Sequence, residues 1–267
     1  MRVEVINPHG FCAGVTHAIK LALSLKGVYC LHELVHNEIV VEGLKRRGFR
    51  FVEDIEEVPE GATVLFSAHG VSPQVKAAAK RRNLKVVDAT CPFVERVHRE
   101  ARAFAEKGYQ VVVIGNENHA EVKGILGEAP NAIVHTDLPA TPTPTTYTSP
   151  LGVVSQTTMN ADDVKAKVEE LKVGYKVETM AQVCNATKER QDAVKAFKGD
   201  ALLVLGSSNS SNTKRLSEVA SCPTFRAGNM EEVRSLDFSG VNTLGVTSGA
   251  STPEEFFNEV IAYLEKL

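Results

Sequence analysis

Three times along the chain, four short apolar segments alternate with stretches whose apolar residues recur at helical spacing. This repeat limits the fold more than any other feature, because near-continuous apolar strands separated by amphipathic helices are typical of parallel sheets covered on both faces. The expected strands are residues 3–7, 28–31, 49–52 and 62–67; 85–89, 110–115, 132–135 and 151–155; and 176–179, 201–206, 223–226 and 242–247. We predict an α/β protein of three similar small units, each a mainly parallel sheet flanked by helices.

The same repeat predicts where the units begin and end. Starting each unit at its first strand gives the units 1–84, 85–175 and 176–267. One larger doubly wound sheet with accidental periodicity is the alternative. Three units are favoured because the cysteine and polar motifs recur in phase with the strands. We expect the units to be arranged in pseudo-threefold fashion around a common centre.

The composition argues against several classes of protein. With 30 basic and 33 acidic side chains, the net charge is -3, which gives no reason to expect a nucleic-acid or membrane surface. No apolar run approaches the roughly 18 residues of a membrane span, and the first residues enter a strand without a signal peptide. We therefore expect a cytoplasmic protein that binds any anionic ligand at a local site.

Three of the five cysteines, Cys12, Cys91 and Cys184, lie where the first strand of a unit turns into a helix. Ligands of open α/β sheets bind at the carboxyl ends of strands, where the next helix presents its N-terminal amides. Three thiolates are too few for a closed zinc site with four thiolate ligands, but they suit an iron–sulfur cluster with one iron free of protein ligands. Cys30, in an apolar strand, and Cys222, before a proline, are expected to be packing residues.

Polar motifs follow the second and fourth strands of each unit and precede helices. Histidines at these positions can donate hydrogen bonds or positive charge to phosphate oxygens, and a serine-rich helix start can cap the helix and bind phosphate with the same amides. The sequence therefore predicts a pocket for a small polyanion. The candidate ligands are His36, His69, His119, Ser210, Ser211 and Asn212.

A proton donor is also predicted in this ring of loops. Glu121 is the one carboxylate there that lies close to His119, which makes it the natural donor for a leaving hydroxyl group. A favourable charge in the first turn of a helix is its alternative role. Thr157 either caps a strand end or orients that proton. The role of His9 stays open.

Nine segments, in order along the chain, resemble the motif set of the LytB family, the 4-hydroxy-3-methylbut-2-enyl diphosphate reductases. They are HGFCAGV, LVHNEIVVEGLKRRGFRFVE, FSAHGVS, VDATCPFV, HAEVKG, SQTT, VCNATKERQ, GSSNSSNTKRL and GVTSGASTP. The chain departs from many members of the family at Ala120 and Lys123, where proline and glutamate are expected. This difference affects the expected shape of one loop and leaves its histidine and glutamate in place.

The resemblance implies the last step of the methylerythritol phosphate route to isoprenoids. In that reaction a two-electron, two-proton reductive dehydration converts the allylic hydroxy-diphosphate into isopentenyl and dimethylallyl diphosphates. The electrons would come from a ferredoxin or flavodoxin type donor. The residues implied are Cys12, Cys91 and Cys184 for a central 4Fe-4S cluster with one open iron; Glu121 and Thr157 for proton supply; and His36, His69, His119, Ser210, Ser211, Asn212 and Ser251 for the diphosphate.

Two other functions are compatible with the same residues. The first is a hydrolase or lyase of phosphorylated substrates, in which three thiolates and a water molecule bind zinc. The second is a non-enzymatic iron–sulfur sensor that binds a phosphometabolite. The sensor would bind diphosphate without turnover and gives no reason for a proton donor at Glu121.

Overall fold

The computed structural model describes residues 1–136, 147–148, 150–179 and 183–267. Its strands are β1 (Arg2–Val5), β2 (Tyr29–Leu31), β3 (Arg50–Val52), β4 (Thr63–Phe66), β5 (Lys85–Asp88), β6 (Gln110–Ile114), β7 (Ile133–His135), β8 (Leu151–Ser155), β9 (Val177–Thr179), β10 (Ala201–Leu205), β11 (Thr224–Ala227) and β12 (Thr243–Ser248). Its helices are α1 (Ala13–Leu23), α2 (Glu38–Arg46), the 3-10 turn η1 (Ile55–Glu57), α3 (Pro73–Arg81), α4 (Pro92–Glu106), α5 (Ala120–Glu128), α6 (Ala161–Gly174), α7 (Asn185–Ala196), α8 (Ser211–Glu218), α9 (Met230–Ser235) and α10 (Glu254–Leu264).

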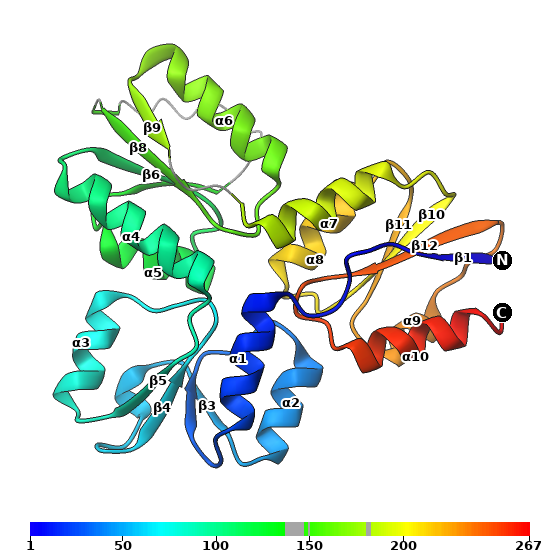
Figure 1. The fold of residues 1–267 in the computed structure, drawn as a ribbon, viewed down its shortest axis with the longest axis horizontal. Coiled ribbons are helices and arrows are strands. Elements are labelled where there is room, and N and C mark those ends of the chain that lie inside the picture. Colours follow the sequence, from blue (N-terminus) through cyan, green and yellow to red (C-terminus); the bar gives the residue numbers. More distant parts are fainter. Residues whose placement is uncertain (137–146, 149, 180–182) are drawn as a thin grey trace. The chain divides into compact units, whose positions relative to one another are not determined.

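The described strands form three parallel four-stranded sheets flanked by helices (Figure 1), which confirms the predicted fold class. The strand orders are β1-β12-β10-β11, β3-β2-β4-β5 and β7-β6-β8-β9. Each order places the second expected strand of a repeat between the third and the fourth. No helix in the described part of the chain is both long and apolar enough to cross a membrane.

The sheets differ from the predicted units 1–84, 85–175 and 176–267 by one strand each. β1 pairs with β12, β5 pairs with β4, and β9 pairs with β8. β5 and β9, which were expected to open the second and third units, therefore each complete the sheet of the strands before them. β1, which was expected to open the first unit, completes the sheet of the C-terminal strands. The apolar pattern does not decide between these pairings, because a parallel neighbour on either side is reached by a crossover of sufficient length.

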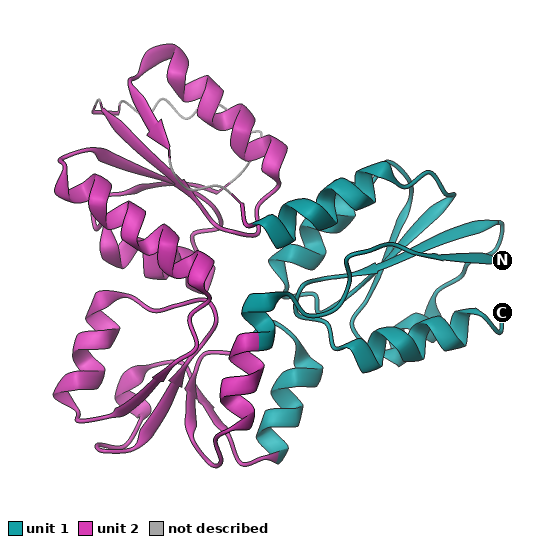
Figure 2. Cartoon of the chain, viewed as in Figure 1, with its two compact units in different colours: residues 1–16, 35–46, 185–267 teal, residues 17–34, 47–184 magenta. Residues whose placement is uncertain are grey.

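The chain divides into two compact units (Figure 2). The first unit comprises residues 1–16, 35–46 and 185–267, and the second comprises residues 17–34 and 47–184. The sheet that contains β1 belongs to the first unit, and the other two sheets belong to the second.

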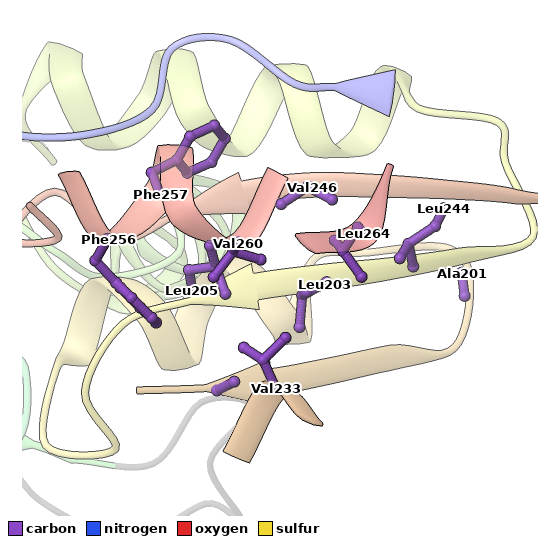
Figure 3. Close-up of a cluster of buried hydrophobic side chains, with 11 residues drawn as sticks. Ala201, Leu203, Leu205, Val233, Leu244, Val246, Phe256, Phe257, Val260 and Leu264 are labelled. Carbon is purple, nitrogen blue, oxygen red and sulfur yellow. The ribbon is translucent and has the colours of Figure 1, made fainter. Parts of the chain in front are cut away.

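In the first unit, alternate residues of β10 supply two separate cores. Leu203 and Leu205 pack with Val260 of α10 on one face, in the cluster drawn in Figure 3. Leu202 and Val204 pack on the opposite face with residues of α7 and α8. Successive side chains of a strand point to opposite faces of the sheet, so burial on both faces makes the strand continuously apolar.

The second unit follows the same rule. Val111 and Val113 of β6 pack against α4 and α5, whereas Val112 and Ile114 pack against α6. Close packing of α4 onto β8 requires a glycine, since a Cβ atom on Gly152 would lie 2.3 Å from Cγ of Phe104. These cores hold the carboxyl ends of the strands in place, and those ends carry the candidate site.

Candidate active site

The three cysteines lie at strand-to-helix junctions, as predicted. Cys12 directly precedes α1, Cys91 is the N-cap residue of α4, and Cys184 directly precedes α7. All three are half-buried thiols outside any disulfide. The amide of Val15 in the first turn of α1 donates to Sγ of Cys12 at 3.5 Å. Helix N-termini favour negative charge, so these positions suit thiolate ligands.

One backbone contact recurs at all three junctions. The amide of Cys12 donates to the carbonyl oxygen of Ala250, that of Cys91 to Ala68, and that of Cys184 to Thr157, at 3.0–3.1 Å. Each acceptor lies two residues beyond the end of a strand, namely β12, β4 and β8. Each cysteine is therefore attached to a loop that carries other candidate residues.

The loop that carries Cys12 is held by buried contacts within the first unit. Ser248 Oγ accepts the amide of Gly10 at 2.8 Å, and a guanidinium nitrogen of Arg190 donates to the Gly10 carbonyl at 2.9 Å. The φ of +70° at Gly10 suits glycine, and a Cβ atom there would lie 2.4 Å from a carboxylate oxygen of Glu254. His9, whose role the sequence left open, stacks on Phe257 with ring centroids 3.8 Å apart.

Four predicted residues of the first unit are connected around Cys12. The amide of Ala250, whose carbonyl holds Cys12, donates to Oδ1 of Asn212 at 3.2 Å. The neighbouring Ser251 donates from Oγ to the carbonyl of His36 at 2.9 Å. These contacts connect the segments that carry Cys12, His36, Asn212 and Ser251 within the first unit, and the binding roles predicted for these residues stay predictions.

The N-terminus of α8 has the expected capping residues. Ser210 is the N-cap, and its hydroxyl accepts the amide of Thr213 at 3.3 Å. Ser211 begins the helix, and the buried Asn212 also donates from Nδ2 to Oγ1 of Thr187 in α7 at 3.2 Å. The helix start thus meets the loop after β12, where its amides favour an anion.

Glu121, in the second unit, is buried and held by Thr157. Oε1 of Glu121 accepts the Thr157 amide at 2.7 Å, and Oε2 lies 3.1 Å from Thr157 Oγ1. Burial raises the pKa of Glu121 from its ordinary 4.5 to about 7, although the hydrogen bonds from Thr157 lower it. Near neutral pH this carboxyl is therefore protonated in a substantial fraction of the molecules.

Of two predicted phosphate ligands in the second unit, His119 contacts the backbone of Glu121 and His69 contacts His119. His119 is the N-cap of α5, and its Nδ1 accepts the amide of Glu121 at 3.2 Å. The ring of His69, in the loop after β4, lies edge-on to the ring of His119, with centroids 5.4 Å apart. The structure thus groups His69, His119, Glu121 and Thr157 in one unit.

The two remaining cysteines are packing residues, as expected. Cys30 is fully buried in β2, and burial raises the pKa of its thiol to about 12, which keeps it protonated. Cys222 packs against the core that contains Ile6.

Arg190, which donates to the Gly10 carbonyl from α7, was not among the predicted site residues. The sequence shows only that Thr187, Arg190, Gln191 and Val194 recur at helical spacing on one face of α7, and the structure shows that all four are buried. A polar residue on the buried face of a helix makes defined hydrogen bonds, so this position was a candidate for a role at the site.

Comparisons with known proteins give consistent results. The chain matches a family described as "LytB protein" over residues 3–265. It is 41% identical over 283 residues to the 4-hydroxy-3-methylbut-2-enyl diphosphate reductase of Anaplasma marginale (strain Florida), which covers 98% of this chain and 82% of the relative. It is 41% identical over 286 residues to the reductase of the same name from Magnetococcus marinus, which covers 99% of this chain and 91% of the relative.

Two solved structures share the fold. One is the E-1-hydroxy-2-methyl-but-2-enyl-4-diphosphate reductase of Plasmodium falciparum, with a TM-score of 0.91 and 35% identity, covering 98% of this chain and 87% of the other. The second is described as (E)-4-hydroxy-3-methyl-but-2-enyl diphosphate reductase, the terminal enzyme of the non-mevalonate pathway. Its TM-score is 0.68 at 33% identity, with full coverage of both chains.

Proposed function

The chain belongs to the LytB family, as its nine motifs predict, and we propose that it reduces 4-hydroxy-3-methylbut-2-enyl diphosphate in the terminal step of the non-mevalonate pathway. The proposed reaction is a two-electron, two-proton reductive dehydration to isopentenyl and dimethylallyl diphosphates. The relatives support the reductase activity, and the residues of the two units support the individual roles that follow.

The proposed cofactor is a 4Fe-4S cluster held by Cys12, Cys91 and Cys184, with one iron free of protein ligands. The thiols are half-buried and placed at helix N-termini, which fits three cluster ligands. When bound, such a cluster supplies electrons and a Lewis-acidic iron for the substrate oxygen. Each of the three cysteines donates an equivalent backbone hydrogen bond, which fixes its position relative to a loop of the site.

Proton delivery is assigned to Glu121. Loss of the substrate hydroxyl as water requires a proton, and a carboxyl with a pKa of about 7 carries one at neutral pH. Thr157 Oγ1 donates to Oε2 of the ionised carboxylate at 3.1 Å; in the protonated acid, whose Oε1 still accepts the Thr157 amide, we place the proton on Oε2, from which it can be donated to Thr157 Oγ1. Thr157 therefore orients the acid, and its hydroxyl can relay the proton.

The diphosphate is assigned to polar groups of both units. In the second unit, the rings of His69 and His119 supply hydrogen-bond donors. In the first unit, the remaining proposed ligands supply hydroxyl, amide and imidazole donors, and the first turn of α8 adds backbone amides. These are His36, Ser210, Ser211, Asn212 and Ser251. We also propose, from the family resemblance, a ferredoxin or flavodoxin type electron donor and a cytoplasmic location.

The observation that carries the proposal is the backbone hydrogen bond from each cysteine amide to a carbonyl in the loop after β12, β4 or β8. It attaches each cysteine to a loop with proposed substrate-binding or proton-transfer residues. The test is the iron and labile sulfide content of anaerobically purified protein, followed by turnover of the hydroxy-diphosphate with a chemical reductant. A 4Fe-4S cluster with reductive dehydration is expected. A cluster without turnover would favour the sensor, and bound zinc without iron would favour the hydrolase or lyase.

A further inference from the structure

His98, in the middle of α4, has no part in the function proposed above, although it is only 1% exposed. Its Nδ1 lies 3.5 Å from a carboxylate oxygen of Glu128, at the limit of a hydrogen bond. Within the described residues neither ring nitrogen makes a hydrogen bond. Arg102 instead donates to Glu128 at 2.7 Å. A buried imidazole with so few polar contacts is an unusual core residue, since most buried polar atoms are paired.

The ring of His98 fills the space between two segments of the candidate site. A Cβ atom on Gly124 of α5 would lie 2.7 Å from Cε1 of His98 and 2.8 Å from its Nε2. A Cβ atom on Gly70, in the loop after β4, would lie 3.3 Å from the same two atoms. Both backbones therefore approach one edge of the imidazole closely; a side chain at Gly124 would clash with the ring, and one at Gly70 would crowd it.

Each of these glycines is close in sequence to a proposed substrate ligand. Gly70 directly follows His69, and Gly124 lies one helical turn after Glu121, which itself follows the His119 N-cap by two residues. The two segments that carry His69 and His119, whose ring centroids are 5.4 Å apart, therefore both pack against His98.

We propose that His98 is a positioning residue that fixes the spacing of His69 and His119 by packing between the loop after β4 and α5. The link to substrate binding rests on the proposed function, in which the two histidines hold the diphosphate. Burial lowers the pKa of His98 more than Glu128 and Glu95 raise it, and Lys76 lowers it further, so the packed ring is neutral. A neutral ring keeps one set of contacts over the working pH range.

The test combines a structural and a binding measurement on the full chain, purified without oxygen. Crystal structures of the wild type and of His98→Ala give the spacing of the His69 and His119 rings, and calorimetry gives the Kd for inorganic diphosphate. The variant is expected to change the spacing by more than about 0.5 Å and to weaken binding roughly tenfold, because ligand-positioning sites tolerate only small displacements.

Two further variants separate positioning from a loss of stability. Phe104→Leu is the matched control, since Phe104 is as deeply buried in the same helix but contacts Gly152. It is expected to lower the melting temperature and leave the ring spacing and the Kd unchanged. Gly124→Ala changes the opposite side of the same contact, and as a single variant it is expected to weaken diphosphate binding. Combined with His98→Ala, it is expected to weaken binding little further, because the imidazole is absent.

Each outcome decides the inference. An unchanged ring spacing in His98→Ala and Gly124→Ala would overturn it, and so would a changed spacing with unchanged diphosphate affinity. Additive effects of His98→Ala and Gly124→Ala would also contradict a shared contact. A changed spacing in a protein whose wild type binds no diphosphate would uphold the positioning role and refute the proposed function of the histidine pair. If His98→Ala does not fold, the spacing and affinity of Gly124→Ala decide.

Discussion

Replacing Glu121 by glutamine is expected to change how the stability of the protein depends on pH. Burial raises the pKa of the carboxyl from 4.5 to about 7, so the folded chain holds this proton more tightly than the unfolded chain does. Glutamine has nearly the same shape, and its side-chain oxygen can still accept the Thr157 amide that now bonds to Oε1. The substitution therefore removes the titration and preserves the main contact.

The sign and size of the effect follow from the shift in pKa. Below about pH 4.5 the carboxyl is neutral in both states and does not make stability depend on pH. As the pH rises to about 7, the unfolded chain releases the proton first, and the free energy of unfolding falls. A pKa raised from 4.5 to about 7 corresponds to a loss of roughly 3 kcal/mol, complete above pH 7.

The assay is unfolding by urea, followed by circular dichroism between about pH 5 and pH 8, with wild type and variant loaded to the same iron content. The stability of Glu121→Gln relative to wild type is expected to increase across this range, while turnover falls by about a hundredfold or more. Glu117→Gln, at an exposed position in the preceding loop, is the control and is expected to show no such trend. A difference that is independent of pH, or that decreases with pH, would refute the reasoning.

Four further predictions test individual contacts. Cys91→Ser is expected to lower the iron and sulfide content of anaerobically purified protein, and an intact cluster with normal activity would contradict the ligand assignment. Thr157→Val keeps the hydrogen bond from the residue 157 amide to Glu121 but removes the hydroxyl oxygen Oγ1, so turnover should fall by less than in Glu121→Gln. Unchanged turnover in a kinetic assay would exclude the relay. Arg190→Leu frees the Gly10 carbonyl and should reduce cluster retention, measured as iron per chain after desalting, whereas equal retention would show that the Cys12 loop is held without it. Turnover of the wild type should fall as the pH rises above about 7, because Glu121 then loses its proton, and a rate that increases through this range would rule Glu121 out as the acid.

The sequence was sufficient to predict the fold class and the placement of the cysteines. Both depend on local patterns, namely near-continuous apolar strands between amphipathic helices and the polar turns that follow the strands. The position of Cys91 as an N-cap, for example, follows directly from the strand before it and Pro92 after it.

Strand pairing and buried polar contacts could not be predicted in the same way. The apolar pattern of residues 85–89 fits an edge strand of either neighbouring sheet, and only tertiary packing makes β5 the partner of β4. The close approach of Gly70 and Gly124 to His98 likewise joins segments that are distant in sequence. Gly70 follows a histidine in a loop and Gly124 lies inside α5, and neither local pattern indicates His98 as the residue that it approaches.

The pairing of β1 with β12 imposes an order on synthesis and folding. Arg2 pairs with Thr243, which the ribosome adds to the chain much later than Arg2. The sheets of β2–β5 and β6–β9 can close while translation continues, because their strands are neighbours along the chain. The edge formed by β1 must wait, since non-local pairing is slow. Cys12, whose amide donates a hydrogen bond to the carbonyl of Ala250, is therefore the last of the three proposed ligand thiols to be fixed, because it waits for the loop after β12.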